Sequence, residues 1–247
     1  MLSIIIPAHN EENCIAETIR AFNKTLKKNK IKHEIEVVND HSTDKTVQVL
    51  DKLKKEIKEL WYVDNEFTPG FGTAIIKGLK SFKGDYVTIV MADLSDDPRE
   101  LVTYYRKIKE GYDCVFGSRF IKGGRVVDYP LHKLVFNRLC NNTIKILFWI
   151  KYNDITNPFK LYTRETIKAL EPFISKHFNL EVEIPLKAIV RGYTYTVVPN
   201  TWRNRTKGIA KFNIKEMGSR YFFIIIYCLI EKILTKGDYR KNYMKRQ

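Results

Sequence analysis

Short apolar runs rich in Val and Ile alternate with longer segments of helical periodicity over the first 120 residues of this chain. Such alternation is typical of βαβ units, in which helices cover both faces of a buried, mostly parallel sheet. The sequence therefore predicts an α/β fold with four or five strands in its first half. The expected strands are 2–7, 34–38, 59–63, 86–91 and 114–117, and the expected helices lie near 12–28, 43–55, 72–82 and 98–109.

The alternation weakens after Arg119. A Gly-rich turn at 122–125 leads to a long apolar helix near 131–150, and a mixed α and β stretch follows. Nothing between 120 and 213 has the composition of a linker, and the chain carries no internal repeat. We therefore expect one domain over 1–212, followed by a distinct segment at 213–247.

Composition excludes several classes of protein. Of the 247 residues, 44% are hydrophobic, which supplies a full-sized core and is unlike a disordered, collagen-like or disulfide-stapled chain. The four cysteines are scattered without a CxxC pair, so we expect reduced, buried thiols in a cytosolic protein. The first apolar run reaches Asn10 after too few residues for a secretion signal, so we expect no export.

The formal charge of +15 has three interpretations: nucleic-acid binding, contact with anionic membranes and phosphorylated substrates, or a general lysine bias on solvated helix faces. No RNA-binding motif, zinc module or basic zipper accompanies the charge. We therefore expect no nucleic-acid partner.

The C-terminal segment contains ten consecutive apolar residues, 221–230, with Lys and Arg on both sides. This run is too short to span a bilayer, which takes about 20 apolar residues. A cation-flanked helix of this kind can lie in the lipid headgroup region as a peripheral membrane contact, or it can pack on the core, or do both. The same alternatives apply to the helix around 136–150.

Acidic side chains follow three of the expected strands, in the segments 7–12, 39–44 and 91–98. Each segment alone can be explained as a helix cap or a solvated loop. Together they meet where parallel sheets bind ligands, at the carboxyl ends of the strands. Carboxylates at the mouth of a basic protein suggest a divalent cation shared with a substrate phosphate, which would stabilise a departing diphosphate.

Four motifs resemble the family 2 glycosyltransferases in their order and spacing. They are IIIPAHNEE at 4–12, VVNDHSTD at 37–44, GFGTA at 70–74 and ADLSDDP at 92–98. Three more resemble the dolichyl-phosphate mannose synthase and polyprenyl-phosphate glycosyltransferase group within that family. These are GSRF at 117–120, DITNPFKLY at 154–162 and RTKGIAKF at 205–212. The resemblance covers roughly residues 2–213.

The resemblance implies a single nucleotide-diphospho-sugar transferase fold of the GT-A type, with a nucleotide-binding half at 1–119 and an acceptor half at 120–212. It implies an inverting transferase that moves a sugar from a UDP or GDP donor to a polyprenyl phosphate at the cytoplasmic membrane face. The nucleotide-sugar site would consist of Pro7, His9, Glu11, Asp40 and Asp93, with Asp40 on the base. Mg²⁺ or Mn²⁺ would be held by Asp93, the last acid of the family's DxD motif, and by Ser95.

Met91 departs from the family pattern, because many members have the first acid of the DxD motif at this position. A thioether is a poor ligand for Mg²⁺, so Asp93 becomes the main protein ligand, assisted by Ser95 or Asp96. The departure also leaves a second interpretation open, a protein that binds a nucleotide sugar without catalysing its transfer. Asn39 and the Asn157–Pro158 pair are further departures.

The resemblance places four cations around the donor diphosphate and the acceptor phosphate: Arg119, Lys133, Arg205 and Lys211. Plain surface charge is the alternative for each of them. The catalytic residues would be Asp93, Arg119, Arg205 and Lys211, since an acceptor phosphate is itself the nucleophile. If the acceptor is instead a sugar hydroxyl of a glycan, a base is required, and Glu183 is the candidate, with an orienting structural acid as its alternative.

Overall fold

The computed structural model describes residues 1–204, 214–235 and 237–241, and for 214–217 only the backbone. Its centre is a seven-stranded sheet with the strand order β3-β2-β1-β4-β7-β5-β8. The strands are β1 (Leu2–Ala8), β2 (His33–Asn39), β3 (Leu60–Asp64), β4 (Tyr86–Ile89), β5 (Cys114–Ser118), β7 (Lys160–Thr163) and β8 (Tyr195–Pro199). A separate two-stranded ladder joins β6 (Arg125–Val127) to β9 (Thr201–Arg203).

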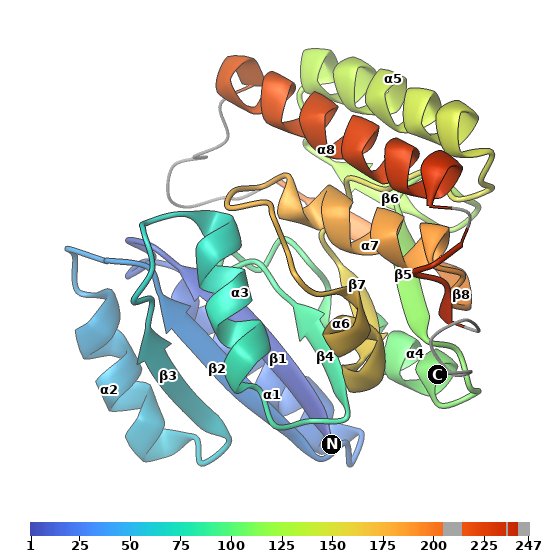
Figure 1. Ribbon diagram of the computed structural model, residues 1–247. Helices are drawn as coiled ribbons and strands as arrows, with labels where there is room; N and C mark the ends of the chain where they lie inside the picture. Colours follow the sequence, from blue (N-terminus) through green and yellow to red (C-terminus); the bar gives the residue numbers. More distant parts are fainter. Residues whose placement is uncertain (205–213, 236, 242–247) are drawn as a thin grey trace.

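Helices cover both faces of the central sheet (Figure 1). They are α1 (Ile15–Lys28), α2 (Thr46–Glu56), α3 (Phe71–Ser81), α4 (Pro98–Ile108), α5 (Leu131–Phe148), α6 (Arg164–Leu170), α7 (Leu180–Val190) and α8 (Ile214–Leu234). Apolar side chains of α1, α2 and α4 join one buried cluster, and those of α3, α6 and α7 join the other. The result is a three-layer arrangement of helices, sheet and helices.

Side chains of β1 point alternately to the two faces of the sheet, so this one strand contributes to both buried clusters. Ile4 and Ile6 pack on the α1 side, whereas Ile5 packs on the α3 side. All seven residues of β1 are buried, as expected for a central strand of a parallel sheet. The same rule accounts for β2, whose seven residues are also buried.

The predicted strands and helices of the first half are confirmed, with ends that differ by a few residues. The mostly parallel sheet is confirmed as well. The four strands after Arg119, β6 to β9, were not predicted individually. Of these, β8 pairs parallel with β5, and β7 lies antiparallel between β4 and β5. This four-residue strand pairs on both sides with strands from the first half, so the region after Arg119 completes the same sheet.

Helices α5 and α8 form a further layer outside α7 (Figure 1). One face of α8 enters the core through Ile224 and Cys228, while Phe223 and Ile233 on other faces are exposed. The core packing agrees with one of the alternatives that the sequence left open, and contact with lipid stays a prediction. Within the described residues, no helix is long and apolar enough to cross a membrane.

Candidate active site

A pocket of about 770 Å³ opens at the carboxyl ends of the central strands. Its walls come from the loops after β1, β2 and β4, the beginnings of α3 and α7, and helices α5 and α8. Eight residues predicted from the sequence lie in this lining: Pro7, His9, Glu11, Asp40, Asp93, Ser95, Arg119 and Lys133. The fold thus brings the acidic strand ends and two of the four cations into one cavity.

Asp40 holds the end of the pocket that was assigned to the nucleoside. Its Oδ1 accepts a hydrogen bond from Asn65 Nδ2 at 2.7 Å, and its Oδ2 accepts one from the Gly70 N–H at 3.0 Å. The Nδ1–H of His9 donates to the Asp40 carbonyl oxygen at 2.6 Å. These bonds join the ends of β1 and β2 to the turn before α3. A Cβ at Gly70 would lie 2.8 Å from the Lys176 carbonyl oxygen, so this turn requires glycine.

Asp93 and Ser95 line the pocket in the loop that follows β4. The Ser95 N–H donates to Asp93 Oδ1 at 3.1 Å, which fixes the carboxylate within the turn. Ser95 is buried, and its Oγ has no hydrogen-bond partner in the described part of the chain. A carboxylate and an unpartnered hydroxyl suit Mg²⁺ or Mn²⁺, which takes few protein ligands and completes its shell with phosphate and water.

Met91 lines the same pocket and offers only a thioether, a poor ligand for these cations. The described residues contain no group of three or more His, Cys, Asp or Glu side chains able to hold a metal ion. A cation at Asp93 and Ser95 would therefore depend on substrate oxygens for the rest of its shell.

Asp96 was offered by the sequence as a further ligand, but it does not line the pocket. It is buried, and burial raises its pKa to about 8, with the nearby carboxylates of Asp93 and Glu100 adding to the effect and the Met91 N–H opposing it. The structure therefore favours Ser95 over Asp96 as the partner of Asp93.

Arg119 is fixed in the wall of the pocket by Asp154. Its Nε donates to Asp154 Oδ2 at 2.9 Å and its Nη2 to Oδ1 at 2.6 Å, while its backbone N–H donates to Oδ2 at 2.9 Å. Both residues are buried. The Asp154 carboxylate raises the pKa of Arg119 against the effect of burial, so the guanidinium stays charged. Asp154 lies in the DITNPFKLY motif, but the motif alone does not indicate this orienting contact.

Asn157, one of the departures from the family pattern, is part of the scaffold behind this wall. It is fully buried, and its Nδ2 donates to the Gly117 carbonyl at 2.8 Å and to Asn200 Oδ1 at 2.9 Å. These bonds connect β5 to the chain that leads into β9. The substitution therefore has a structural explanation that does not involve a ligand.

Glu183 does not line the pocket. Its carboxylate is fully buried and accepts hydrogen bonds from the backbone N–H groups of Ile174 and Ser175 and from Lys187 Nζ. With these donors in place, it is not positioned to take a proton from an acceptor in this pocket. The structure agrees with the alternative that the sequence left open, an acid that orients a loop.

Glu181, two residues earlier on α7, does line the pocket and was not singled out from the sequence. Nearly every residue of α7 is buried, so hydrophobic periodicity could not show which of the two acids faces the cavity. Arg205 and Lys211 lie outside the described residues. The described chain reaches the pocket at Asn204, directly before Arg205.

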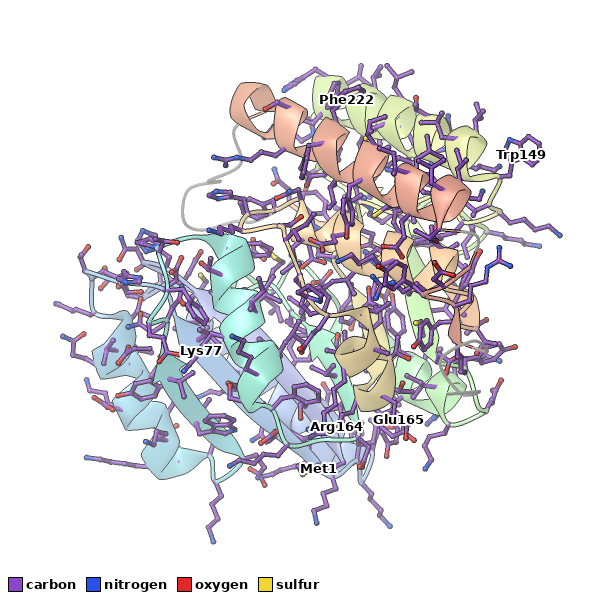
Figure 2. All side chains as sticks on the ribbon, in the orientation of Figure 1. Met1, Lys77, Trp149, Arg164, Glu165 and Phe222 are labelled. Atoms are coloured by element: carbon purple, nitrogen blue, oxygen red, sulfur yellow. The ribbon has the colours of Figure 1, made fainter. Side chains whose placement is uncertain are left out.

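The far end of the pocket is apolar. Its lining there includes Phe136, Leu139 and Cys140 of α5 and Tyr221, Phe222 and Ile225 of α8. Phe136, Leu139 and Phe222 are also among the exposed apolar side chains, so the cavity wall continues onto the outer surface. Figure 2 shows Phe222 in this layer and Trp149 pointing away from the end of α5.

Comparison with solved structures supports the fold. A glucosyl-3-phosphoglycerate synthase from Mycobacterium tuberculosis, solved with Mn²⁺, UDP and glucosyl-3-phosphoglycerate, superposes with a TM-score of 0.69. The match covers 94% of this chain and 79% of that chain at 18% identity. The same enzyme solved with Mg²⁺ and UDP gives 0.68 over 94% of this chain and 79% of that chain, also at 18% identity. These matches show the GT-A fold.

Several proteins are similar in sequence, two of which illustrate the match. The glycosyltransferase AglD of Haloferax volcanii is 27% identical over 225 residues, which is 89% of this chain but only 36% of that protein. The polyprenol monophosphomannose synthase of Mycolicibacterium smegmatis is 28% identical over 227 residues, 86% of this chain and 82% of that protein. Residues 3–171, more than half of the chain, match the family model described as Glycosyl transferase family 2. The chain therefore belongs to glycosyl transferase family 2.

Proposed function

We propose that the chain transfers a sugar from a nucleoside-diphosphate sugar to a polyprenyl phosphate, with inversion at the anomeric carbon, on the cytoplasmic face of a membrane. One observation carries this proposal. A single pocket joins Asp40 and Asp93 at one end to the apolar walls of α5 and α8 at the other, with Arg119 and Lys133 also in its lining. A charged donor, a phosphate and a lipid chain each match one of these three sets of side chains.

The donor binds at the acidic end. Pro7, His9, Glu11 and Asp40 surround the nucleoside, with UDP and GDP as the candidate carriers. Asp93 and Ser95 would hold Mg²⁺ or Mn²⁺ beside the diphosphate. When bound, this ion neutralises the charge that grows on the departing diphosphate. The solved relatives with Mn²⁺ or Mg²⁺ and UDP support this assignment.

The acceptor phosphate binds at Arg119 and Lys133. A phosphate is already anionic at neutral pH and attacks without a general base, but it must approach a second anion. Cations reduce that repulsion, and the guanidinium of Arg119 is held in position by Asp154. We assign Arg205 and Lys211 to the same task, with Lys211 helping to exclude water once the donor is bound.

The lipid chain leaves along α5 and α8. Both helices expose large apolar side chains, including Leu131, Ile146 and Trp149 on or directly after α5 and Phe223 and Ile233 on α8. Lys145 and Lys232 add positive charge to the same layer. Apolar side chains with flanking cations suit peripheral contact with an anionic lipid surface. The activity named for the Mycolicibacterium smegmatis relative agrees with a polyprenyl phosphate acceptor.

Labelled donors test the proposal. Labelled UDP-glucose, UDP-N-acetylglucosamine and GDP-mannose are each incubated with the chain, Mn²⁺ and polyprenyl phosphate, and lipid and water phases are then separated. We expect one donor to yield an acid-labile glycolipid, and Asp93→Ala to abolish it. Label found only on an added sugar acceptor would indicate the alternative, transfer to a glycan hydroxyl. Donor binding without any transfer would indicate the non-catalytic binder that Met91 allows.

A further inference from the structure

Glu181 lies in the wall of the pocket, and one oxygen of its carboxyl group has no hydrogen-bond partner among the described residues. The residue lies in the first turn of α7 and is 5% exposed. Its Oε1 is shielded from solvent and accepts no hydrogen bond from any residue that the structure describes. Buried carboxyl oxygens are normally satisfied, so an exception within a binding pocket points to a ligand.

The neighbouring cation does not satisfy this oxygen. Lys160 is fully buried, and its Nζ donates to the backbone carbonyls of Ile155, Asn157 and Glu181. Its charge lowers the pKa of the Glu181 carboxyl, but burial has the larger effect and raises that pKa to about 7. Glu183 makes the contrast clear, since three donors surround its carboxylate on the same helix.

The chemistry of the substrates limits what Glu181 can bind. Phosphate groups would be repelled by a carboxylate, and a lipid chain has no hydrogen-bond donor. Hydroxyl groups of the donor can bind, because each can donate to a carboxylate oxygen. The nucleoside has donors of this kind too, but the proposed function assigns it to Asp40, which leaves the hydroxyls of the transferred sugar.

Contacts around α7 place Glu181 on the donor side. The ring of Phe178 stacks on Phe71 at 4.1 Å between centroids, and the Lys176 carbonyl accepts the Gly72 N–H at 3.1 Å. The segment before Glu181 is thereby packed on the beginning of α3, which Asp40 also holds through Gly70. Glu181 and the nucleoside end are parts of one connected wall.

We propose that Glu181 accepts a hydrogen bond from a hydroxyl of the sugar carried by the donor and so helps to select which sugar is transferred. This inference rests on the proposed donor class. It adds a residue whose role is recognition of the sugar, separate from the nucleoside, metal and phosphate sites.

Calorimetric titration of Glu181→Leu and Glu181→Gln tests the assignment, with Glu183→Gln as the matched control on the same helix. Each protein is titrated, with Mn²⁺ present, against the sugar nucleotide selected by the donor screen and against the corresponding nucleoside diphosphate. For Glu181→Leu we expect the Kd of the sugar nucleotide to rise about 10- to 100-fold and that of the nucleoside diphosphate to change less than about twofold. Glu181→Gln keeps an acceptor oxygen and should therefore lose less affinity for the sugar nucleotide than Glu181→Leu.

Thermal unfolding separates this role from a structural one. Removing an unsatisfied buried carboxylate should leave the unfolding midpoint of Glu181→Leu equal to or above that of the wild type. Glu183→Gln should unfold at a lower temperature, because its charged partner Lys187 is left buried. A clear fall in the midpoint of both Glu181 variants would overturn the proposal.

Monodeoxy analogues of the donor identify the hydroxyl. The wild type should bind one analogue about 10- to 100-fold more weakly than the parent, and Glu181→Leu should show less than about a twofold difference for the same pair. The assignment would be contradicted if Glu181→Leu still bound the deoxy analogue about 10- to 100-fold more weakly than the parent sugar nucleotide. It would also be contradicted if Glu181→Leu bound the sugar nucleotide and the nucleoside diphosphate equally more weakly than the wild type. If the wild type bound no sugar nucleotide at all, the proposed function itself would fail.

Discussion

At the scale of single residues, the contact between Asp154 and Arg119 combines a structural and a functional role. Burying two charges is costly unless each is fully paired, and here the guanidinium and the backbone N–H of Arg119 share one carboxylate. Sequence motifs could suggest Arg119, because it follows a strand end. They could not show that Asp154, 35 residues later, orients it, because that contact depends on the packing of the tertiary structure.

Asp154→Ala should therefore cost both stability and activity. We expect the free energy of unfolding to fall by about 3–5 kcal/mol, because the Arg119 charge remains buried without its partner. Denaturant unfolding measures this loss. Arg20→Ala removes an exposed ion pair with Glu56 and should change stability by no more than about 1 kcal/mol. If the two substitutions lowered the free energy of unfolding equally, the buried Asp154–Arg119 pair would contribute no more to stability than an exposed ion pair.

Glu36, which lies away from the pocket, tests how a buried carboxyl group affects stability as the pH changes. It lies fully buried on β2, and burial raises its pKa to about 7. The folded state therefore binds a proton that the unfolded state has released, so this group makes stability fall as pH rises from about 4.5 to about 7.

Glu36→Gln should thus stabilise the protein more at high pH than at low pH. Relative to the wild type, we expect a gain of about 2–3 kcal/mol at pH about 8 and little gain at pH about 4.5, since one pKa unit corresponds to about 1.4 kcal/mol. Chemical denaturation at the two pH values measures the difference. The exposed Glu165→Gln is the control and should show no such pH dependence. A gain independent of pH would mean that Glu36 is not protonated in the folded state.

At the scale of secondary-structure elements, the sequence predicted what short-range patterns determine. The strands β1 and β5 are buried and mostly apolar, so their apolar runs stood out. In β2, which is also buried, Ile35, Val37 and Val38 gave the signal. Strand β7 did not, because only four residues form it and its place depends on long-range pairing with β4 and β5. On α7 both Glu181 and Glu183 are buried, and only the folded structure distinguishes the acid in the pocket from the acid in the core.

We expect α8 to pack on the core with one face and to contact a lipid surface with another. Substitutions at two adjacent residues can separate these two roles. Ile224→Ala, at a fully buried position, should lower the free energy of unfolding by about 2–5 kcal/mol. Phe223→Ser, where the side chain is 60% exposed, should leave stability within about 0.5 kcal/mol but weaken binding to anionic vesicles roughly tenfold.

Vesicle sedimentation and thermal unfolding measure the two effects. Ile233→Ser, also at an exposed position of α8, should behave like Phe223→Ser. If neither exposed substitution changes sedimentation, the apolar layer of α5 and α8 faces something other than lipid.

At the scale of the whole molecule, the pocket joins three environments that the sequence placed far apart. The acidic strand ends lie at one end, Arg119 lines the wall and is held by Asp154, and α5 and α8 supply the apolar side chains. In Figure 1 these two helices lie on the side of the molecule away from the N-terminus, so a lipid surface there leaves α1 and α2 in solvent. The proposed peripheral contact would need no helix that spans the membrane.

The most direct test of the account is whether Asp40 and Asp93 act on one bound donor. UDP and GDP are titrated calorimetrically into the wild type, Asp40→Ala and Asp93→Ala, with and without Mn²⁺. For the preferred nucleotide, we predict that Mn²⁺ tightens binding to the wild type at least about tenfold, that Asp93→Ala loses this gain, and that Asp40→Ala binds more weakly in both conditions. If Mn²⁺ still tightened nucleotide binding to Asp93→Ala, or if neither substitution altered binding, the claim that Asp40 and Asp93 share one donor site would be contradicted.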